Sequence, residues 1–99
     1  MEYAYRAEKP LGYVQLAVDT ATTLGAIPVG AVFAIIVPEN QAIRFRDDGV
    51  APTATVGMPL PVLARLKYTV GNLQALRVIG QVAGAIVNVA YYGLSLIHI

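Results

Sequence analysis

The segment Ala42-Ile43-Arg44-Phe45-Arg46-Asp47-Asp48-Gly49 carries the pattern that decides the fold prediction. Ile43 and Phe45 alternate with the two arginines, and a two-residue period is typical of a strand with one face in a core and the other in water. The Asp-Asp-Gly sequence that follows predicts a turn, because glycine tolerates positive φ and aspartate can bond nearby backbone groups. One strand and one turn are therefore predicted within this short segment.

Similar short segments recur along the whole chain of 99 residues. Proline or glycine interrupts the sequence about every ten residues, and the pieces between are rich in Val, Ile, Tyr, Thr and Phe. This spacing predicts an all-β fold, a single-domain antiparallel β-sandwich (jelly-roll-like) of about seven or eight short strands. Besides residues 42–46, the expected strands are 13–18, 31–37, 64–70, 76–79 and 85–92, and a further short strand could split off near residues 15–24.

Alternation within these segments also predicts which side chains face the core. In residues 64–70, the side chains expected to point inward are Leu66, Tyr68 and Val70, and those expected to point outward are Arg65, Lys67 and Thr69. Residues 85–92 place Val87, Val89 and Tyr91 on one face and Ile86, Asn88 and Tyr92 on the other. The sequence Pro38-Glu39-Asn40 separates two strands and predicts a tight hairpin connection.

The composition excludes most catalytic chemistry. Hydrophobic residues make up 57% and charged residues 13% of the chain, whereas charged residues are near a quarter of a usual soluble domain. The chain has no cysteine, its single histidine is His98 and its single serine is Ser95, so thiol, serine and most metal chemistry lack their usual residues. We therefore predict no enzymatic activity, no cofactor and no metal. The net charge of +1 also predicts no nucleic-acid partner.

Two uncharged stretches, residues 20–38 and 78–99, are long enough to test for membrane helices. The first contains Pro28 and Pro38, and the second is interrupted by glycines and Asn88, so neither is expected to span a membrane. Charged residues within the first ten positions also argue against a signal peptide. The apolar excess therefore favours a compact domain that shares its surface with other subunits.

The last six residues, Leu94-Ser95-Leu96-Ile97-His98-Ile99, resemble the in-frame translation of a transposon-end adapter used in DNA sequencing libraries. Such a segment is excluded from fold reasoning. The expected organisation is therefore an N-terminal extension at residues 1–10, a β-sandwich domain at residues 11–93 and a non-native tail at residues 94–99.

The densest polar cluster lies within residues 44–53 and leaves several interpretations open. Two adjacent aspartates make a poor pair for glycosidase chemistry, and they supply too few oxygens for calcium. A structural interpretation has the aspartates bond backbone amides and pair with an arginine of the strand, and a functional one makes the segment an interface. The candidate residues for an interface or structural turn are Arg44, Arg46, Asp47, Asp48, Gly49, Pro52 and Thr53.

The six tyrosines allow a separate hypothesis. Aromatic rings can stack on sugars, but tyrosines also pack in cores and at sheet edges with the hydroxyl in contact with water. Packing is the favoured interpretation, and carbohydrate binding stays the alternative. The residues are Tyr3, Tyr5, Tyr13, Tyr68, Tyr91 and Tyr92.

Residues 41–60, which read QAIRFRDDGVAPTATVGMPL, resemble the signature of a family of small proteins from tailed bacteriophages and prophages. Weaker similarity at residues 11–13, 27–31, 73–79 and 83–92 extends the resemblance over roughly residues 11–92. The family is similar in length and closes near the double tyrosine. The resemblance implies an all-β, virion-associated protein, and it brings no catalytic residues.

These observations lead to a prediction of function. We expect a phage or prophage structural protein, either a virion accessory or decoration protein or a head–tail subunit, that is made in the host cytoplasm and resides in the virion. Its expected partners are other virion proteins and further copies of itself. The alternative is a carbohydrate- or receptor-binding β-module of a phage fibre.

Overall fold

The computed structural model describes residues 4–69 and 73–98, with side chains described for residues 7–69 and 73–95. Strands and one short 3-10 helix account for the regular structure of these residues. The elements are β1 (Ala4–Ala17), β2 (Thr22–Thr23), β3 (Phe33–Pro38), β4 (Ile43–Arg46), β5 (Met58–Leu60), β6 (Leu66–Tyr68), η1 (Leu73–Ala75), β7 (Arg77–Gly80) and β8 (Ile86–His98).

The strands form two four-stranded antiparallel sheets. Sheet A has the order β1-β8-β3-β6, and sheet B has the order β2-β7-β4-β5. The pairing is nested: β1 pairs with β8, β2 with β7, β3 with β6 and β4 with β5. The predicted all-β sandwich is confirmed. The prediction of a hairpin at Pro38-Glu39-Asn40 is wrong, because β3 lies in sheet A and β4 lies in sheet B.

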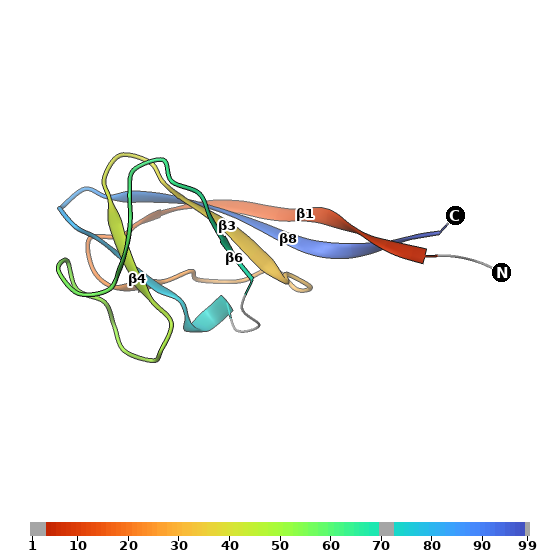
Figure 1. Cartoon of the computed structure of the whole chain (residues 1–99), viewed down its shortest axis with the longest axis horizontal. Helices are drawn as coiled ribbons and strands as arrows, with labels where there is room; N and C mark the ends of the chain where they lie inside the picture. The colour runs from red at the N-terminus through yellow and green to blue at the C-terminus, as the bar shows by residue number, and fades with distance from the viewer. Residues whose placement is uncertain (1–3, 70–72, 99) are drawn as a thin grey trace.

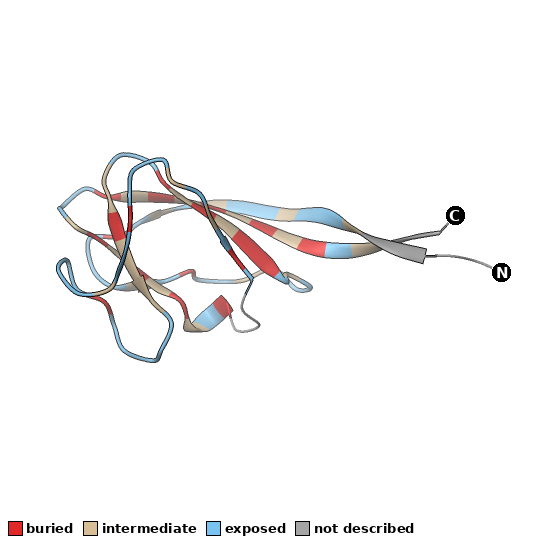
Figure 2. Ribbon diagram, in the orientation of Figure 1, coloured by how far each residue is buried: buried red, intermediate tan, exposed pale blue. Residues whose placement is uncertain are grey.

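The core lies between the two sheets and follows the alternation in the sequence (Figure 2). In β8 the inward side chains Val87, Val89 and Tyr91 are buried, as predicted, and they pack with Ile36 of β3. In β6 Tyr68 is buried and Lys67 is exposed, also as predicted, while Val70 lies outside the described residues. Sheet B contributes buried side chains from β4, β5 and β7, namely Ile43, Leu60 and Val78.

Several strands differ from their predicted bounds. β5 was not predicted, because Pro59 lies in its middle, but proline is tolerated in an edge strand and β5 is the edge of sheet B. β2 falls within the region expected to split off a short strand. β1 and β8 are much longer than predicted, because β1 begins at Ala4 and β8 continues to His98.

The long strands β1 and β8 form a two-stranded ribbon that leaves the sandwich (Figure 1). Their register runs from Ala4 opposite His98 to Ala17 opposite Ile86, with an irregularity between Pro10 and Gly12. The molecule is consequently elongated, with extents of 55 × 25 × 20 Å. The expected boundaries at residues 10/11 and 93/94 therefore fall inside continuous strands. The origin of residues 94–99 in an adapter stays a prediction.

One end of the sandwich is held together by its own loops. The Asn40 side chain donates to the Gly84 carbonyl at 2.8 Å and accepts from the Ile86 amide at 2.9 Å. The Asp19 carboxylate accepts from the Gly84 amide at 2.7 Å. These bonds connect the β1–β2, β3–β4 and β7–β8 loops. Among the described residues, no helix has the length and apolar character needed to cross a membrane.

Candidate functional site: the signature loop

The polar segment at residues 44–53 begins in β4 and continues into the loop that connects β4 to β5. Ile43 lies opposite Leu60, and Phe45 lies opposite Met58. Residues 47–57, which connect the two strands, are called the signature loop below. Because Ile43 is buried and Phe45 packs against the core, the alternating arginines Arg44 and Arg46 face outward on sheet B. Both outward arginines bond to groups of the loop.

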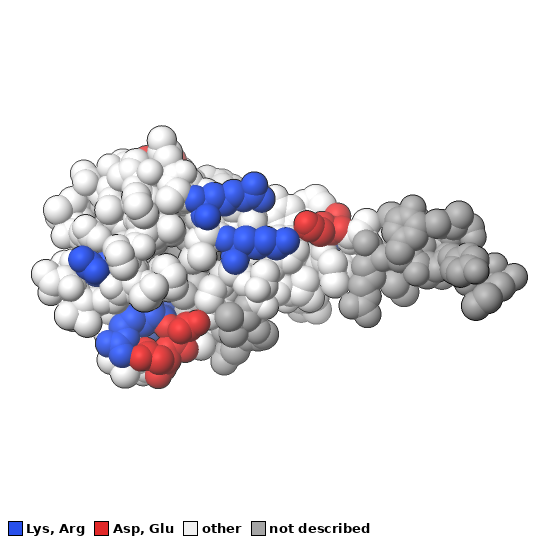
Figure 3. Space-filling view, in the orientation of Figure 1, with Lys and Arg blue, Asp and Glu red and all other residues white. Residues whose placement is uncertain are grey.

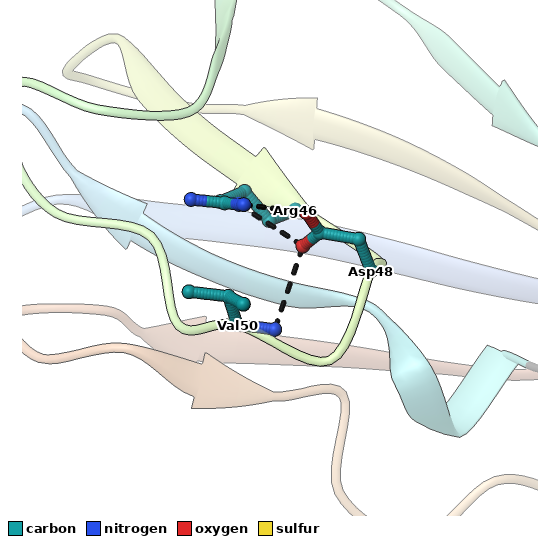
Figure 4. A network of polar contacts seen from close by, with 3 residues as sticks. All are labelled: Arg46, Asp48 and Val50. Carbon is teal, nitrogen blue, oxygen red and sulfur yellow. Dashed lines mark hydrogen bonds and ion pairs between the residues drawn. The ribbon is translucent and has the colours of Figure 1, made fainter.

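Arg46 and Asp48 form a two-point ion pair at the start of the loop (Figure 4). The Arg46 guanidinium donates to the two Asp48 carboxylate oxygens at 3.0 and 2.5 Å. The hydrogen bond from Arg46 holds the pKa of the Asp48 carboxyl below its usual value, and the same bond raises the pKa of Arg46. Asp48 also accepts from the Val50 amide at 3.4 Å, around Gly49 at a φ of 86°. Asp48 thus both pairs with an arginine and bonds a backbone amide.

Arg44 holds the far side of the loop through carbonyl groups. Its guanidinium donates to the Ala54 carbonyl at 3.2 Å and to the Gly57 carbonyl at 2.9 Å. Gly57 has a φ of 143°, and a Cβ there would lie 3.1 Å from the Arg44 Cβ and 3.2 Å from the Pro52 Cβ. The backbone therefore approaches the strand at a point where only glycine fits well.

Pro52 and Thr53 form the inner part of the loop. Pro52 is buried. The Thr53 hydroxyl accepts from the Val56 amide at 3.0 Å and from the Thr55 amide at 3.3 Å, while the Thr53 amide donates to the Val56 carbonyl at 2.8 Å. These bonds make residues 53–56 a compact turn, since a threonine hydroxyl can take the place of a backbone acceptor.

Asp47 has a different partner, which sequence reasoning missed. Its carboxylate accepts a hydrogen bond at 2.7 Å from the hydroxyl of Tyr68, which belongs to β6 of sheet A. Burial, together with the hydrogen bond to Asp47 and the negative charge of Asp47, raises the pKa of Tyr68 to about 12. The signature loop of sheet B is thus connected to sheet A. The sequence held only the expectation that Tyr68 faces inward, with no sign of its partner.

A shallow open pocket lies between the start and the end of the signature loop, and its volume is about 270 Å³. Sites for small molecules are usually larger, about 300–1,000 Å³. Three apolar side chains of this region are strongly exposed, since Val50 is 52%, Val56 52% and Met58 62% accessible. The lining residues are Arg46, Asp47, Asp48, Val56, Gly57 and Met58.

The carboxylates of the signature loop bond to the molecule's own groups, and several of its exposed side chains are apolar. The carboxylates of Asp47 and Asp48 bond to different groups, a tyrosine hydroxyl and a guanidinium. Within the described residues, no group of three or more His, Cys, Asp or Glu side chains could hold a metal ion. What the loop does offer is a bonded backbone framework with apolar side chains at its surface.

The tyrosines fall into different environments. Tyr91 is buried and donates to the Leu24 carbonyl at 3.2 Å, while Tyr92 stacks on Phe33 with the ring centres 5.1 Å apart. Tyr13 is 63% exposed. Tyr3 and the side chain of Tyr5 lie outside what the structure describes.

Comparison of the chain with known protein families, curated proteins and solved structures gives no match.

Proposed function

We propose that this chain is a structural subunit of a bacteriophage or prophage virion, an accessory or decoration protein or a head–tail subunit. It acts through contacts with other virion proteins and with copies of itself, without enzymatic activity, cofactor or nucleic acid. It is made in the host cytoplasm and resides in the virion. The resemblance of residues 41–60 to a phage signature supports the setting, and the geometry of the signature loop supports the mode of action.

The observation that carries the proposal is the prebuilt signature loop. Arg46 bonds to the start of the loop and Arg44 to its end, and Tyr68 connects the loop to the other sheet. A loop that is ordered before binding loses little conformational entropy when a partner binds. The exposed side chains of Val56 and Met58 lie beside the pocket, which matches the apolar centre with a polar rim that is found in protein interfaces.

The nested strand order supports the same proposal. The orders β1-β8-β3-β6 and β2-β7-β4-β5 arise when one antiparallel ribbon, with β1–β4 along one side and β5–β8 along the other, folds over on itself. We assign this arrangement to the jelly-roll class, which is common among viral capsid domains. Folds host many functions, so this analogy supports the viral setting and leaves the contact surface to be tested directly.

Mass spectrometry of purified virions from the phage or induced prophage that carries the gene tests the proposal. We expect the protein in the particles at a fixed copy number. We also expect Met58→Asp to lower incorporation, because a carboxylate would be desolvated at the contact. The matched control is Val82→Asp, which changes an exposed valine that does not line the pocket of the signature loop, and it is expected to leave incorporation unchanged. Absence of the wild-type protein from virions would contradict the proposal.

Tyr13 favours a second candidate function, carbohydrate binding by a fibre module. Its exposed ring lies beside polar side chains, because Tyr13 donates to Asn88, and Gln15 donates to Glu39 at 3.1 Å. A ring beside amide and carboxylate groups can stack on a sugar and bond its hydroxyls. Binding to immobilised host-surface glycans that is lost in Tyr13→Ala, with an unchanged melting temperature, would support this candidate over the first.

A further inference from the structure

The outer face of sheet A is a regular grid of side chains. The register places Gln15, Asn88, Val37 and Arg65 along one row across β1, β8, β3 and the residue before β6. The next row holds Tyr13, Ala90, Ile35 and Lys67. Ile86 and the stacked pair Tyr92 and Phe33 lie at the two ends of the grid. We call this surface the A face.

The centre of the A face is apolar, unlike most solvent-facing sides of antiparallel sheets. Ile35 of β3 lies opposite Ala90 of β8, and Val37 lies opposite Asn88. Ile86 is the next outward residue of β8, so Asn88 is the one polar side chain among these five partly exposed residues. At one end, the Lys67 ammonium lies 4.4 Å from the centre of the Phe33 ring and 3.9 Å from the Glu8 carboxylate. The apolar centre therefore has polar groups at its edges, which is the anatomy of a protein interface.

The two long edges of the A face carry opposite charge. Glu39 follows β3, but its side chain reaches toward the β1 edge, where the carboxylate accepts from Gln15 of β1 at 3.1 Å and from Asn88 of β8 at 3.2 Å. Along the β6 edge lie Arg65 and Lys67, which are both exposed. Neither Glu39 nor Arg65 has an ion-pair partner among the residues that the structure describes.

We propose that the A face binds the A face of a second copy of this chain, related by a two-fold axis parallel to the strands. Such an axis exchanges the two long edges, so the β6 edge of one copy faces the β1 edge of the other. Arg65 and the Glu39 carboxylate lie at the same row of the grid, because Arg65 shares its row with Gln15 and Asn88. The operation therefore brings Arg65 of each copy opposite Glu39 of the other, and the apolar centres meet. An isologous interface is self-complementary in this way.

The size of the A face is adequate for such a pairing. Strands about 4.8 Å apart and outward rows about 6.7 Å apart give a four-by-four grid of roughly 500 Å² in projection. Accessible area exceeds projected area, so the face approaches the roughly 800 Å² per partner that a stable interface buries. Sheets that pack face to face keep their strands roughly aligned, as this axis requires.

This inference rests on the proposed role as an assembly subunit and names one partner and one surface for it. The two can fail separately. A monomeric protein that is still found in virions would overturn the self-association and leave the proposed function intact. A protein that dimerises but is absent from virions would overturn the proposed function and leave the self-association intact.

Sedimentation velocity on the full chain, over a range of protein concentrations, tests the surface. We expect a concentration-dependent dimer for the wild type and for Val82→Asp. We expect Ala90→Glu to be monomeric with unchanged circular dichroism, because it places a carboxylate at the apolar centre. A wild type that stays monomeric throughout, or an Ala90→Glu variant that dimerises as well as the wild type, overturns the proposal.

A charge exchange tests the symmetry axis. Arg65→Glu alone and Glu39→Arg alone each place like charges opposite one another at both symmetric contacts, and we expect each to weaken the dimer by about tenfold or more. An equimolar mixture of the two variants forms a heterodimer in which both contacts are again complementary. The double variant Arg65→Glu/Glu39→Arg restores both contacts in its own homodimer. Recovery of dimer in the mixture supports the axis. Weakening of both single variants without recovery in the mixture overturns it.

Discussion

The outer faces of the two sheets satisfy their side chains in different ways. On sheet B the outward side chains Arg44 and Arg46 bond to the molecule's own signature loop. On sheet A the outward side chains at the centre are mostly apolar, and Lys67 covers only the Phe33 ring at one end of the face. One face thus uses charge to hold a segment of its own chain, and the other has partly exposed apolar side chains at its centre. In the space-filling view, basic and acidic atoms lie together in one cluster at the lower left of the molecule (Figure 3).

This difference separates two expected contributions, one to the folding of a single copy and one to the proposed association of copies. A guanidinium that bonds loop carbonyls contributes to the folded state, so changes on sheet B are expected to lower the free energy of unfolding. Partly exposed apolar side chains contribute little to the folding of one copy but much to association. Substitutions on the two faces separate these two contributions.

Gly57→Ala is expected to have the largest effect among changes on the outer face of sheet B. The residue needs a φ of 143°, and its new Cβ would lie 3.1 Å from the Arg44 Cβ and 3.3 Å from the Phe45 carbonyl oxygen. Backbone strain and crowding together should cost about 2–4 kcal/mol of unfolding free energy. Urea denaturation measures this loss. An unchanged midpoint would contradict the close approach of the loop to β4.

Gly49→Val separates strain from crowding in the same loop. Gly49 has a φ of 86°, but no atom lies within 4 Å of a Cβ built there. Strain alone should cost about 1–3 kcal/mol. The control is Gly49→Asn, because asparagine tolerates the left-handed region better than valine and should lose less. Equal losses in the two variants would show that the side chain meets a neighbour.

Arg44→Ala should open the far side of the loop. Two hydrogen bonds from a charged donor are lost, so we expect a cost of about 1–3 kcal/mol. Hydrogen exchange at the Val56 amide should also become faster than in the wild type. The matched control is Arg77→Ala, which removes an outward arginine of β7 that donates no side-chain bond to the described residues. Equal losses of unfolding free energy in the two variants would show that the bonds from Arg44 to the loop carbonyls do not stabilise the fold.

Tyr68→Phe should change the pH dependence of stability. In the unfolded chain a tyrosine loses its proton near pH 10, whereas in the fold the pKa of Tyr68 is about 12. The stability that depends on the protonated hydroxyl is therefore fully present below pH 10 and is lost as the pH rises through about 12. The variant should show a shallower decline in unfolding free energy over this interval. Tyr91→Phe is the comparison, since burial also raises the pKa of Tyr91.

The sequence predicted the sandwich because alternation is a local property. Leu66 and Tyr68 point inward and Lys67 outward as the two-residue period requires, and Val87, Val89 and Tyr91 face the core for the same reason. β5 could not be found in this way, because its three residues are too few to show a period and include Pro59. The connection at residues 39–42 was misjudged because local turn chemistry does not say which sheet the next strand joins.

The signature loop was predictable only in part. The bond between Arg46 and Asp48 spans two positions, and the Asp-Gly sequence already indicated a turn there. The bond between Asp47 and Tyr68 spans 21 positions and depends on the nested packing of the two sheets. Arg44 bonds backbone carbonyls, which are present at every residue and leave no mark in the sequence. Long-range partners and backbone partners could therefore be identified only from the structure.

Val37→Thr is expected to have the smallest effect on folding and is the sharpest test of the A face. Threonine keeps the shape and strand preference of valine, and position 37 faces outward, so the change should stay within about 0.5 kcal/mol at low protein concentration. Val89→Thr makes the same change at a fully buried position and should cost about 1–3 kcal/mol, because a hydroxyl loses water in the core. At high protein concentration the wild type should be more stable, because self-association involves only the folded state and therefore favours it. Val37→Thr should gain less, and an equal gain would place the contact elsewhere on the molecule.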